Sequence, residues 1–511
     1  NENAIISLKH FTKENLTKTN QLNLKLFTEL TKKELEISQF NRHLLPFSHR
    51  GGVQLAHEDV EVLPLKNLQD YRFWIERLKN IDKRVNQTIR LAKLGLQKGY
   101  RPPEILMKRV DRQIDLQTRD SVDENPFFKI FISLPDSIND NEKIALRSEA
   151  RKVIREVVIP SYQLLGKYFK DEYLPQSRKS VGLYDIPNGR ELYELLANSY
   201  TTTDLTPEAI HQIGLKEVSR IRSEMEKVIE QLEFQGSFKD FLQFLREDKQ
   251  FYYETSEELF EGYLAVSKRI DPELVKLFGK LPRTPYGLRA IPIESAPDTT
   301  TAYYMAPAPG GLRPGYYYVN LYKPETRPKF EMEVLSVHEA VPGHHLQIAL
   351  AMEMEEMPMF RRVSPYTAFV EGWGLYSESL GYDLGLYKDP YSKFGQLTYD
   401  MWRAVRLVVD TGIHYYEWDR QRAIDFFMDN AGKSELDITN EIDRYIVMPG
   451  QALAYKIGQM KFLSLKQKAR SELGKNFNIR DFHDTVLSQG ALPLNELDSL
   501  VEGYIKENGE R

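Results

Sequence analysis

The chain has no cysteine among its 511 residues. This absence excludes disulfides, thiolate zinc sites, iron–sulfur clusters and a cysteine nucleophile, so any metal must be held by His, Asp or Glu. An excess of either charge is also missing, because 69 Lys and Arg residues stand against 74 Asp and Glu residues, for a net charge of -5. This balance gives no electrostatic reason to expect nucleic acid or an anionic membrane as a partner.

Long apolar runs are absent too. No segment approaches the roughly 20 apolar residues that a transmembrane helix needs, and no signal peptide opens the chain. Because the first residue is Asn rather than Met, we expect a processed or trimmed chain. The polar residues 1–45 suit a spacer behind a removed export signal, as in a periplasmic or lipid-anchored protein. They equally suit the N-terminal helix of a cytoplasmic protein.

Helical periodicity is the main feature that is present. Apolar residues recur at intervals of three and four from about residue 8 to residue 278 and again from residue 329 to the C-terminus. Thr206 and Pro207 predict the N-cap and first turn of a long helix. Between the two helical regions, residues 281–323 hold aromatic and β-branched segments cut by Pro and Gly, which predicts two or three short strands.

These patterns predict a mainly α fold, with two helical lobes around a deep cleft and a small antiparallel β-sheet near the active site. Residues 1–45 are expected to form an N-terminal helical segment or spacer, and residues 46–511 one large helical unit. Within that unit we expect the β region at about 281–323 and the helices of a metal site at about 329–460.

The stretch VHEAVPGHHLQ, residues 337–347, combines a His-Glu pair with a His-His pair. Zinc peptidases usually place two ligand histidines four residues apart on one helix, with a glutamate beside the first. Here His338 precedes His344 by six residues and His345 by seven. On a regular helix, six residues span about 9 Å along the axis and seven span about 10.5 Å. Neither pair could then bind one zinc ion.

Pro342 and Gly343 stand between the pairs and predict a break or bulge in the helix, because proline lacks a backbone donor and glycine tolerates unusual dihedrals. A bulge that takes up two residues makes His344 the second ligand, and one that takes up three makes it His345. We favour His344. Glu339, beside the first ligand, is then the expected general base.

A third ligand is expected from the segment YTAFVEGWGLYSESLG, residues 366–381. Glu371 stands there among apolar neighbours, where a lone carboxylate is costly to bury, so a ligand or paired role is favoured. Glu378 lies seven residues later on the same helix face and is expected to support a ligand rather than bind the metal.

Several motifs follow one another along the chain, among them HEAVPGHHLQ, VEGWGLYSE, LVVDTGIH and RYIVMPGQALAYKIGQMK, with ELLANSYTTTDLTPEAIHQIGLKEVSRI and RPGYYYVNLY before them. From about residue 40 to the end they resemble the bacterial family called domain of unknown function 885, some of whose members are exported lipoproteins. That family is similar to the mainly helical zinc carboxypeptidases and dipeptidases, which have a deep channel between two lobes. The resemblance implies His338, His344 and Glu371 as metal ligands and Glu339 as the base.

Three further residues are candidates for the chemistry. Asp410 lies four residues before His414, a spacing that lets a carboxylate orient an imidazole, so His414 could stabilise an oxyanion, bind substrate or be a core histidine. Arg444 could grip the C-terminal carboxylate of a substrate or form a structural ion pair. Tyr455 is a candidate phenol for oxyanion stabilisation.

The expected strand region supplies candidates for substrate binding. Tyr317, Tyr318 and Asn320 are predicted to line the substrate groove, unless the region only covers the core. The sequence as a whole predicts a zinc-dependent hydrolase, a metallopeptidase that acts on short peptides. Hydrolysis of another small amide, or a non-catalytic metal- or peptide-binding protein with a distorted site, are the alternatives.

Overall fold

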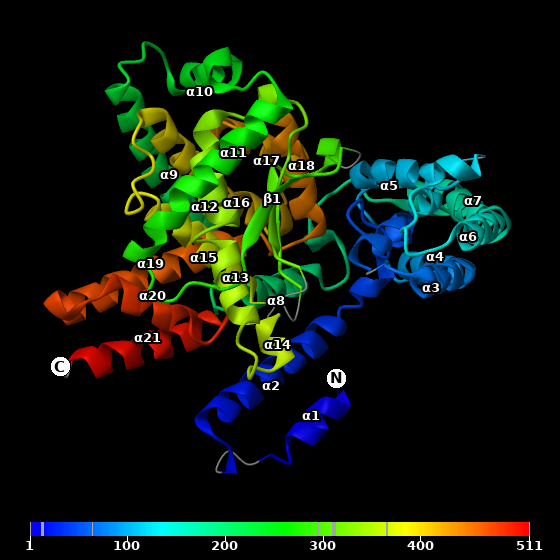
Figure 1. Cartoon of the computed structure of the whole chain (residues 1–511), viewed down its shortest axis with the longest axis horizontal. Helices are drawn as coiled ribbons and strands as arrows, with labels where there is room; N and C mark the ends of the chain where they lie inside the picture. Colours follow the sequence, from blue (N-terminus) through cyan, green and yellow to red (C-terminus); the bar gives the residue numbers. More distant parts are fainter. Residues whose placement is uncertain are drawn as a thin grey trace. The chain divides into compact units, whose positions relative to one another are not determined.

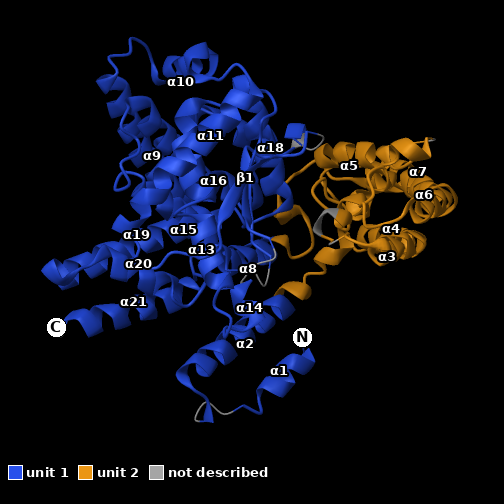
Figure 2. Cartoon of the chain, in the orientation of Figure 1, with its two compact units in different colours: residues 1–36, 190–511 blue, residues 37–189 orange. Residues whose placement is uncertain are grey.

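The structure, a computed structural model, describes residues 2–11, 15–63, 65–119, 121–293, 296–308, 313–363 and 366–509. Figure 1 shows that helices dominate, which confirms the predicted mainly α fold. The chain divides into two compact units, which Figure 2 colours separately: unit 1 is residues 1–36 with 190–511, and unit 2 is residues 37–189. Among the described residues, no helix has both the length and the apolar character to cross a membrane.

Unit 2 is a helical bundle around a core of aromatic and aliphatic side chains, such as Trp74, Phe127 and Tyr162. The segment after α6 and the end of α7 each pass through a short π-helical stretch, at Ile154–Val158 and Phe169–Tyr173. Its α-helices are α3 (Leu68–Leu78), α4 (Ile81–Gln97), α5 (Glu104–Leu116), α6 (Asp140–Val153) and α7 (Ile159–Tyr168).

Unit 1 carries all the residues predicted for the metal site. Its α-helices are α1 (Glu2–Leu8), α2 (Lys18–Ser38), α8 (Gly189–Thr201), α9 (Pro207–Gln231), α10 (Phe238–Glu247), α11 (Ser256–Ile270), α12 (Met332–Glu339), α13 (His344–Met352), α14 (Met359–Arg362), α15 (Thr367–Leu380), α16 (Pro390–His414), α17 (Arg420–Asn430), α18 (Glu435–Val447), α19 (Leu453–Leu473), α20 (Ile479–Leu487) and α21 (Leu494–Gly509). The start predicted for α9 is confirmed, because the Thr206 side chain accepts a hydrogen bond from the Ala209 N–H.

Two helix pairs organise unit 1. Helix α16 is buried from Phe394 to His414, its polar and charged residues included, and packs along α9. Helices α15 and α19 approach most closely at Gly372 and Gly458, where an added methyl group on either glycine would overlap the backbone of the other helix. This close crossing fixes α15, the helix that carries Glu371 and Glu378.

The sheet has three strands, β1 (Tyr286–Ala290), β2 (Ala302–Met305) and β3 (Gly315–Val319), within the predicted 281–323 region. The prediction of an antiparallel sheet is wrong, because the sheet is mixed. Strand β3 lies in the middle, antiparallel to β2 and parallel to β1. After β1 the chain crosses to the opposite edge of the sheet to form β2. It then returns to the middle position as β3.

Candidate metal centre

The helix that begins at Met332 is interrupted between the two histidine pairs, as the sequence predicts. Helix α12 ends at Glu339 and α13 begins at His344. At the interruption the Gly343 N–H donates to the carbonyl of Val337, six residues back, at 2.9 Å. A regular helix bonds four residues back, so the turn takes up two extra residues. The Val341–Pro342 peptide bond within it is cis.

Residue 343 must be glycine because the backbone of α12 passes close to its Cα atom. A Cβ atom at this position would lie 1.9 Å from the carbonyl oxygen of His338 and 2.4 Å from that of Val337. Such distances are far below van der Waals contact, so a side chain here would push α12 and α13 apart. The glycine therefore allows α12 and α13 to lie close together because it has no side chain, and not because it adopts an unusual φ.

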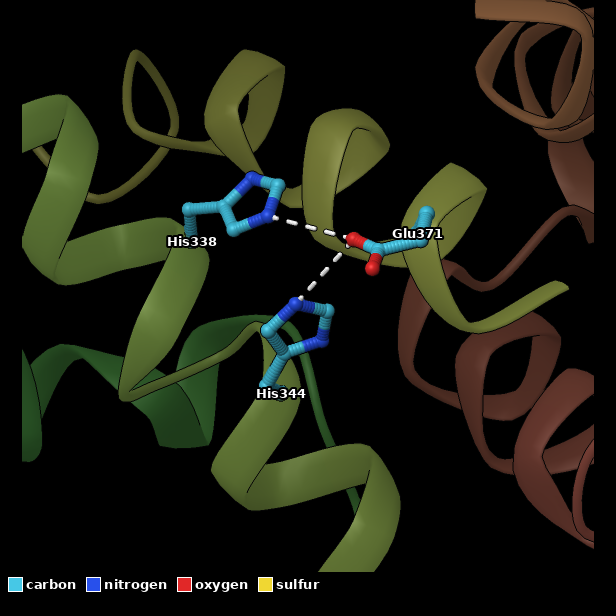
Figure 3. A group of neighbouring side chains, drawn as sticks. All are labelled: His338, His344 and Glu371. Carbon is cyan, nitrogen blue, oxygen red and sulfur yellow. Dashed lines mark ion pairs between the residues drawn. The ribbon is translucent and has the colours of Figure 1, made fainter. Parts of the chain in front are cut away.

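The interruption brings His338 and His344 to the same carboxylate (Figure 3). His338 Nε2 lies 3.7 Å from Glu371 Oε2, and His344 Nε2 lies 3.3 Å from the same oxygen. One ligand atom from each residue lies within 4.8 Å of the other two, so the three side chains could hold a metal ion together. Nitrogen and oxygen ligands of a tetrahedral zinc ion are about 3.3 Å apart, given metal–ligand distances of about 2.05 Å. The donor set therefore fits a transition-metal ion.

The cluster is buried without being sealed. The side chain of His338 is 3% exposed, that of His344 10% and that of Glu371 20%. Burial in low dielectric strengthens the attraction between a cation and the carboxylate. The remaining exposure of Glu371 leaves access for a water molecule or a substrate atom, which a metal site with an open coordination position needs.

A second carboxylate orients the first histidine. Glu378, fully buried, accepts a hydrogen bond from His338 Nδ1 at 2.8 Å, and the Arg403 guanidinium lies 3.5 Å from the same carboxylate oxygen. With Nδ1 bonded to Glu378, Nε2 is the ring nitrogen that faces Glu371. Carboxylates placed in this way behind a histidine fix the ring and increase its basicity as a ligand.

The carboxylates also set the charge of the cluster. Burial opposes a charge on His338, but hydrogen bonds with Glu371 and Glu378 outweigh it and raise the pKa of His338 to about 9. Burial opposes a charge on Glu371 as well, yet hydrogen bonds from His338 and His344 hold its pKa well below the usual range. The group thus has the strong affinity for positive charge that a cation would use, and protons compete for the same lone pairs.

Two residues of α15 hold this arrangement in place. The Trp373 indole Nε1–H donates to the carbonyl oxygen of Pro342 at 2.8 Å and so ties the interruption to the helix of Glu371. Gly374 makes room for the His338 ring, because a Cβ atom there would lie 2.9 Å from both Cε1 and Nε2 of that ring. Neither role was predicted from the sequence, although both residues stand in the motif VEGWGLYSE.

His345 lies outside the cluster. Its Nε2–H donates to the carbonyl of Thr284 at 3.1 Å, so its Nδ1 accepts from the Tyr304 hydroxyl at 2.8 Å. Burial lowers the pKa of His345 to about 4, which keeps the ring neutral. Of the two alternatives for the second histidine, His344 is the one that faces His338 and Glu371.

Glu339, the predicted base, is the last residue of α12 and is half-buried. Within the described part of the chain its carboxylate makes no hydrogen bond or ion pair to another residue. A carboxylate beside a metal-binding histidine and not engaged elsewhere is able to exchange a proton with a bound water or substrate.

The comparison with protein families agrees with the order of motifs along the chain. The profile of a bacterial protein family of unknown function, DUF885, matches residues 1–501. The chain belongs to this family. The family description names no activity, so the chemistry of this DUF885 chain has to be argued from its site.

Solved structures of two bacterial proteins are similar to this chain. A "putative lipoprotein" from Colwellia psychrerythraea is 33% identical with a TM-score of 0.83, and the match covers 87% of this chain and 77% of that one. A "putative lipoprotein of unknown function" from Shewanella oneidensis is 19% identical with a TM-score of 0.71, over 97% of this chain and 90% of that one. The second similarity shows the fold alone. No curated protein matches the chain.

The structure places His414 in the core of unit 1. Its Nε2–H donates to the carbonyl of Tyr445 at 3.0 Å, and its ring lies against Tyr193. Asp410 accepts hydrogen bonds from the Tyr193 hydroxyl at 2.6 Å and from the Gly450 N–H at 3.0 Å. These contacts join α16 to α8, α18 and the turn before α19, and a catalytic role for His414 stays a prediction.

The residues predicted for the substrate groove differ in their surroundings. Tyr317 is fully buried against Tyr263, and the Asn320 side-chain amide donates to backbone carbonyls, including that of Ala296 at 2.8 Å. Both therefore stabilise the sheet and its connections. Tyr318 is half-buried and stacks on Tyr303 at a centroid distance of 4.8 Å, so of the three it alone retains exposed surface.

Arg444 and Tyr455 are neighbours. The Arg444 guanidinium contacts the Tyr455 hydroxyl at 3.4 Å and the Glu441 carboxylate at 3.2 Å. Arg406, which the sequence analysis did not single out, stacks on the Tyr455 ring at 4.2 Å. Only the fold could reveal this grouping, because its members come from α16, α18 and α19.

Proposed function

We propose that this protein is a zinc-dependent hydrolase that cleaves amide bonds of short peptides. The observation that carries the proposal is the meeting of His338, His344 and Glu371 around a common point, with Glu339 next to the first histidine. Two imidazoles and one carboxylate are a ligand set of catalytic zinc sites, which keep one coordination position open. The absence of cysteine leaves these side-chain types as the available ligands.

The proposed chemistry is the addition of water to an amide carbonyl. When bound, zinc polarises the carbonyl and makes water a nucleophile at neutral pH. Glu339 takes a proton from the attacking water as its oxygen bonds to the carbonyl carbon. The carbon–nitrogen bond then breaks, and Glu339 passes the proton to the leaving amine. Glu378 and Arg403 keep the His338 ring oriented through this cycle.

A peptide is the proposed substrate because the DUF885 family, to which the chain belongs, is similar to the helical zinc carboxypeptidases and dipeptidases. A mainly α fold that buries its metal-binding group suits this class, since a buried site admits short chains more readily than folded proteins.

The substitution Glu339→Gln tests the proposal. It removes the base but no metal ligand, so we expect hydrolysis of a mixture of short peptides to fall by at least about 100-fold while the zinc content, measured by elemental analysis, stays at the wild-type level. Glu356→Gln, on an exposed part of the chain, is the matched control and should change neither. Unchanged hydrolysis in Glu339→Gln would contradict the proposal. Zinc binding without hydrolysis at any zinc loading would favour the non-catalytic alternative.

A further inference from the structure

A group of polar side chains joins α16, α18 and α19 in the interior of unit 1. This basic cluster consists of Arg406, Glu441, Arg444, Tyr445 and Tyr455. Arg406 donates to Glu441 at 2.9 Å and to the Tyr445 hydroxyl at 2.8 Å, and that hydroxyl donates to Glu441 at 2.7 Å. Arg444 reaches the same carboxylate from the other side at 3.2 Å. One carboxylate thus serves two guanidinium groups.

The cluster holds more positive than negative charge. The side chains of Arg406 and Arg444 are 4% and 12% exposed, and Glu441 is their one carboxylate partner among the described residues. Asp410 also interacts electrostatically with both arginines, but its hydrogen bonds go to Tyr193 and Gly450. A buried cation without a counter-charge is costly. The imbalance therefore favours binding of an anionic group.

The cluster also has unused hydrogen-bonding capacity. Within the described residues, Arg406 Nη1 is buried and has no hydrogen-bond partner. Arg444 Nη2 donates to the neutral side-chain oxygen of Gln451 and, at 3.4 Å, to the Tyr455 hydroxyl. A carboxylate is a stronger acceptor than a neutral amide oxygen. An incoming carboxylate would thus improve the bonding of Arg444.

Two routes through the fold connect the cluster to the helix that carries Glu371 and Glu378. Gly458 packs directly on Gly372, the residue after Glu371, and Tyr455 lies one turn before Gly458 on α19. Along α16, Arg403 contacts Glu378, and Arg406 is one turn further on. The first route starts at the residue after Glu371 and the second at Glu378, the partner of His338, and each reaches the cluster within one helical turn.

We propose that the substrate carries a free carboxylate on the amine side of the scissile bond, and that Arg444 and Tyr455 bind this carboxylate. The inference rests on the proposed hydrolase function and narrows it to removal of a C-terminal residue or cleavage of a dipeptide or N-acyl amino acid. Arg444 supplies the charge and a two-pronged donor geometry, and the Tyr455 hydroxyl supplies a further donor. Arg406 supports both from behind, through Glu441 and the Tyr455 ring.

Trialanine and trialanine amide are the probes that test this inference, because they differ only in the terminal carboxylate. We expect zinc-loaded wild-type protein to cleave trialanine with a kcat/KM at least about 30-fold above that for the amide, as for a desolvated charge pair. In Arg444→Gln the preference should disappear, because kcat/KM should fall for trialanine and stay unchanged for trialanine amide. Arg420→Gln is the matched control. Arg420 pairs with Asp443, the residue before Arg444 on α18, so this variant loses a nearby arginine but should keep the preference.

Calorimetric binding of the same two peptides to zinc-loaded Glu339→Gln protein gives a readout without turnover. Preferential binding of trialanine, lost in the double variant with Arg444→Gln at unchanged zinc content, supports the inference even if no peptide is cleaved. In that case the hydrolase proposal fails while the carboxylate site stands. Equal cleavage or equal binding of acid and amide by protein with intact Arg444 would overturn the carboxylate site and leave the hydrolase proposal standing.

Discussion

The Trp373 side chain links the interruption between the two histidines to the helix that carries Glu371. It lies two residues after Glu371 on α15, and its indole N–H bonds to the carbonyl of Pro342, between His338 and His344. The ring itself is fully buried against Phe278 and Phe462. The tryptophan therefore fixes the position of the interruption relative to the third ligand.

Replacing Trp373 with Phe should weaken metal binding more than it weakens the fold. Phenylalanine keeps most of the aromatic packing but loses the hydrogen bond to Pro342, so the loop between the two histidines gains freedom. Partners that orient metal ligands are typically worth about 10-fold or more in affinity. We expect a zinc dissociation constant at least about 10-fold higher, measured by competition with a chelating dye.

Trp418→Phe, two residues before α17, is the control and should leave zinc affinity unchanged. Equal zinc affinity in Trp373→Phe and wild type would show that the hydrogen bond to Pro342 does not position the ligands.

Single residues were predictable from the sequence where local spacing decided their role. The spacing of His338 from His344 and His345, with Pro342 and Gly343 between, predicted a bulge of two or three residues with two favoured, and the structure has a bulge of two. Arg406 and Gly374 could not be assigned in this way. Their roles depend on helices that are distant in sequence and become neighbours only in the fold.

At the scale of elements, helices were easier to predict than strand pairing. Periodicity and local caps define a helix, and the start of α9 at Pro207 follows from Thr206 beside it. The order of the sheet depends on which strand fills the middle position, and nothing in the residues of β1 states that its neighbour is β3 rather than β2. The antiparallel prediction failed for this reason.

The turn between α12 and α13 is itself a defined structural element. Helices α12 and α13 are separate elements, yet the Gly343 N–H and the His345 N–H both bond back across the gap, to Val337 and Ala340. The gap is therefore a bonded turn with a defined geometry. It takes up two residues, so His344, six residues after His338, lies where a residue four positions later would lie on an unbroken helix.

At the scale of the whole molecule, acid should destabilise the protein partly through His483. This buried histidine donates from Nδ1 to the Leu277 carbonyl and accepts at Nε2 from the Tyr376 hydroxyl, so it is fully bonded when neutral. Burial lowers its pKa to about 3. Between that pH and the usual pKa of about 6.5 the unfolded chain takes up a proton that the folded chain does not, so the contribution to stability is lost as the pH falls through this window.

The substitution His483→Gln should flatten this dependence. One proton of difference corresponds to about 1.4 kcal/mol per pH unit. We therefore expect the free energy of unfolding, from urea titrations at pH 4 to 6, to fall less steeply with acid in the variant, by up to that slope. The comparison of slopes separates titration from any loss of packing. Parallel slopes for variant and wild type would show that His483 does not take up the proton on unfolding.

The proposed metal site requires that the interruption brings His344, and not His345, to His338 and Glu371. The most direct test is the zinc stoichiometry of purified protein after loading and dialysis, for His344→Gln and His345→Gln beside wild type. These two substitutions are chemically identical and adjacent in the chain. We predict about one zinc per chain in wild type and His345→Gln and a large loss in His344→Gln. Retention of zinc in His344→Gln with loss in His345→Gln would contradict the proposed site.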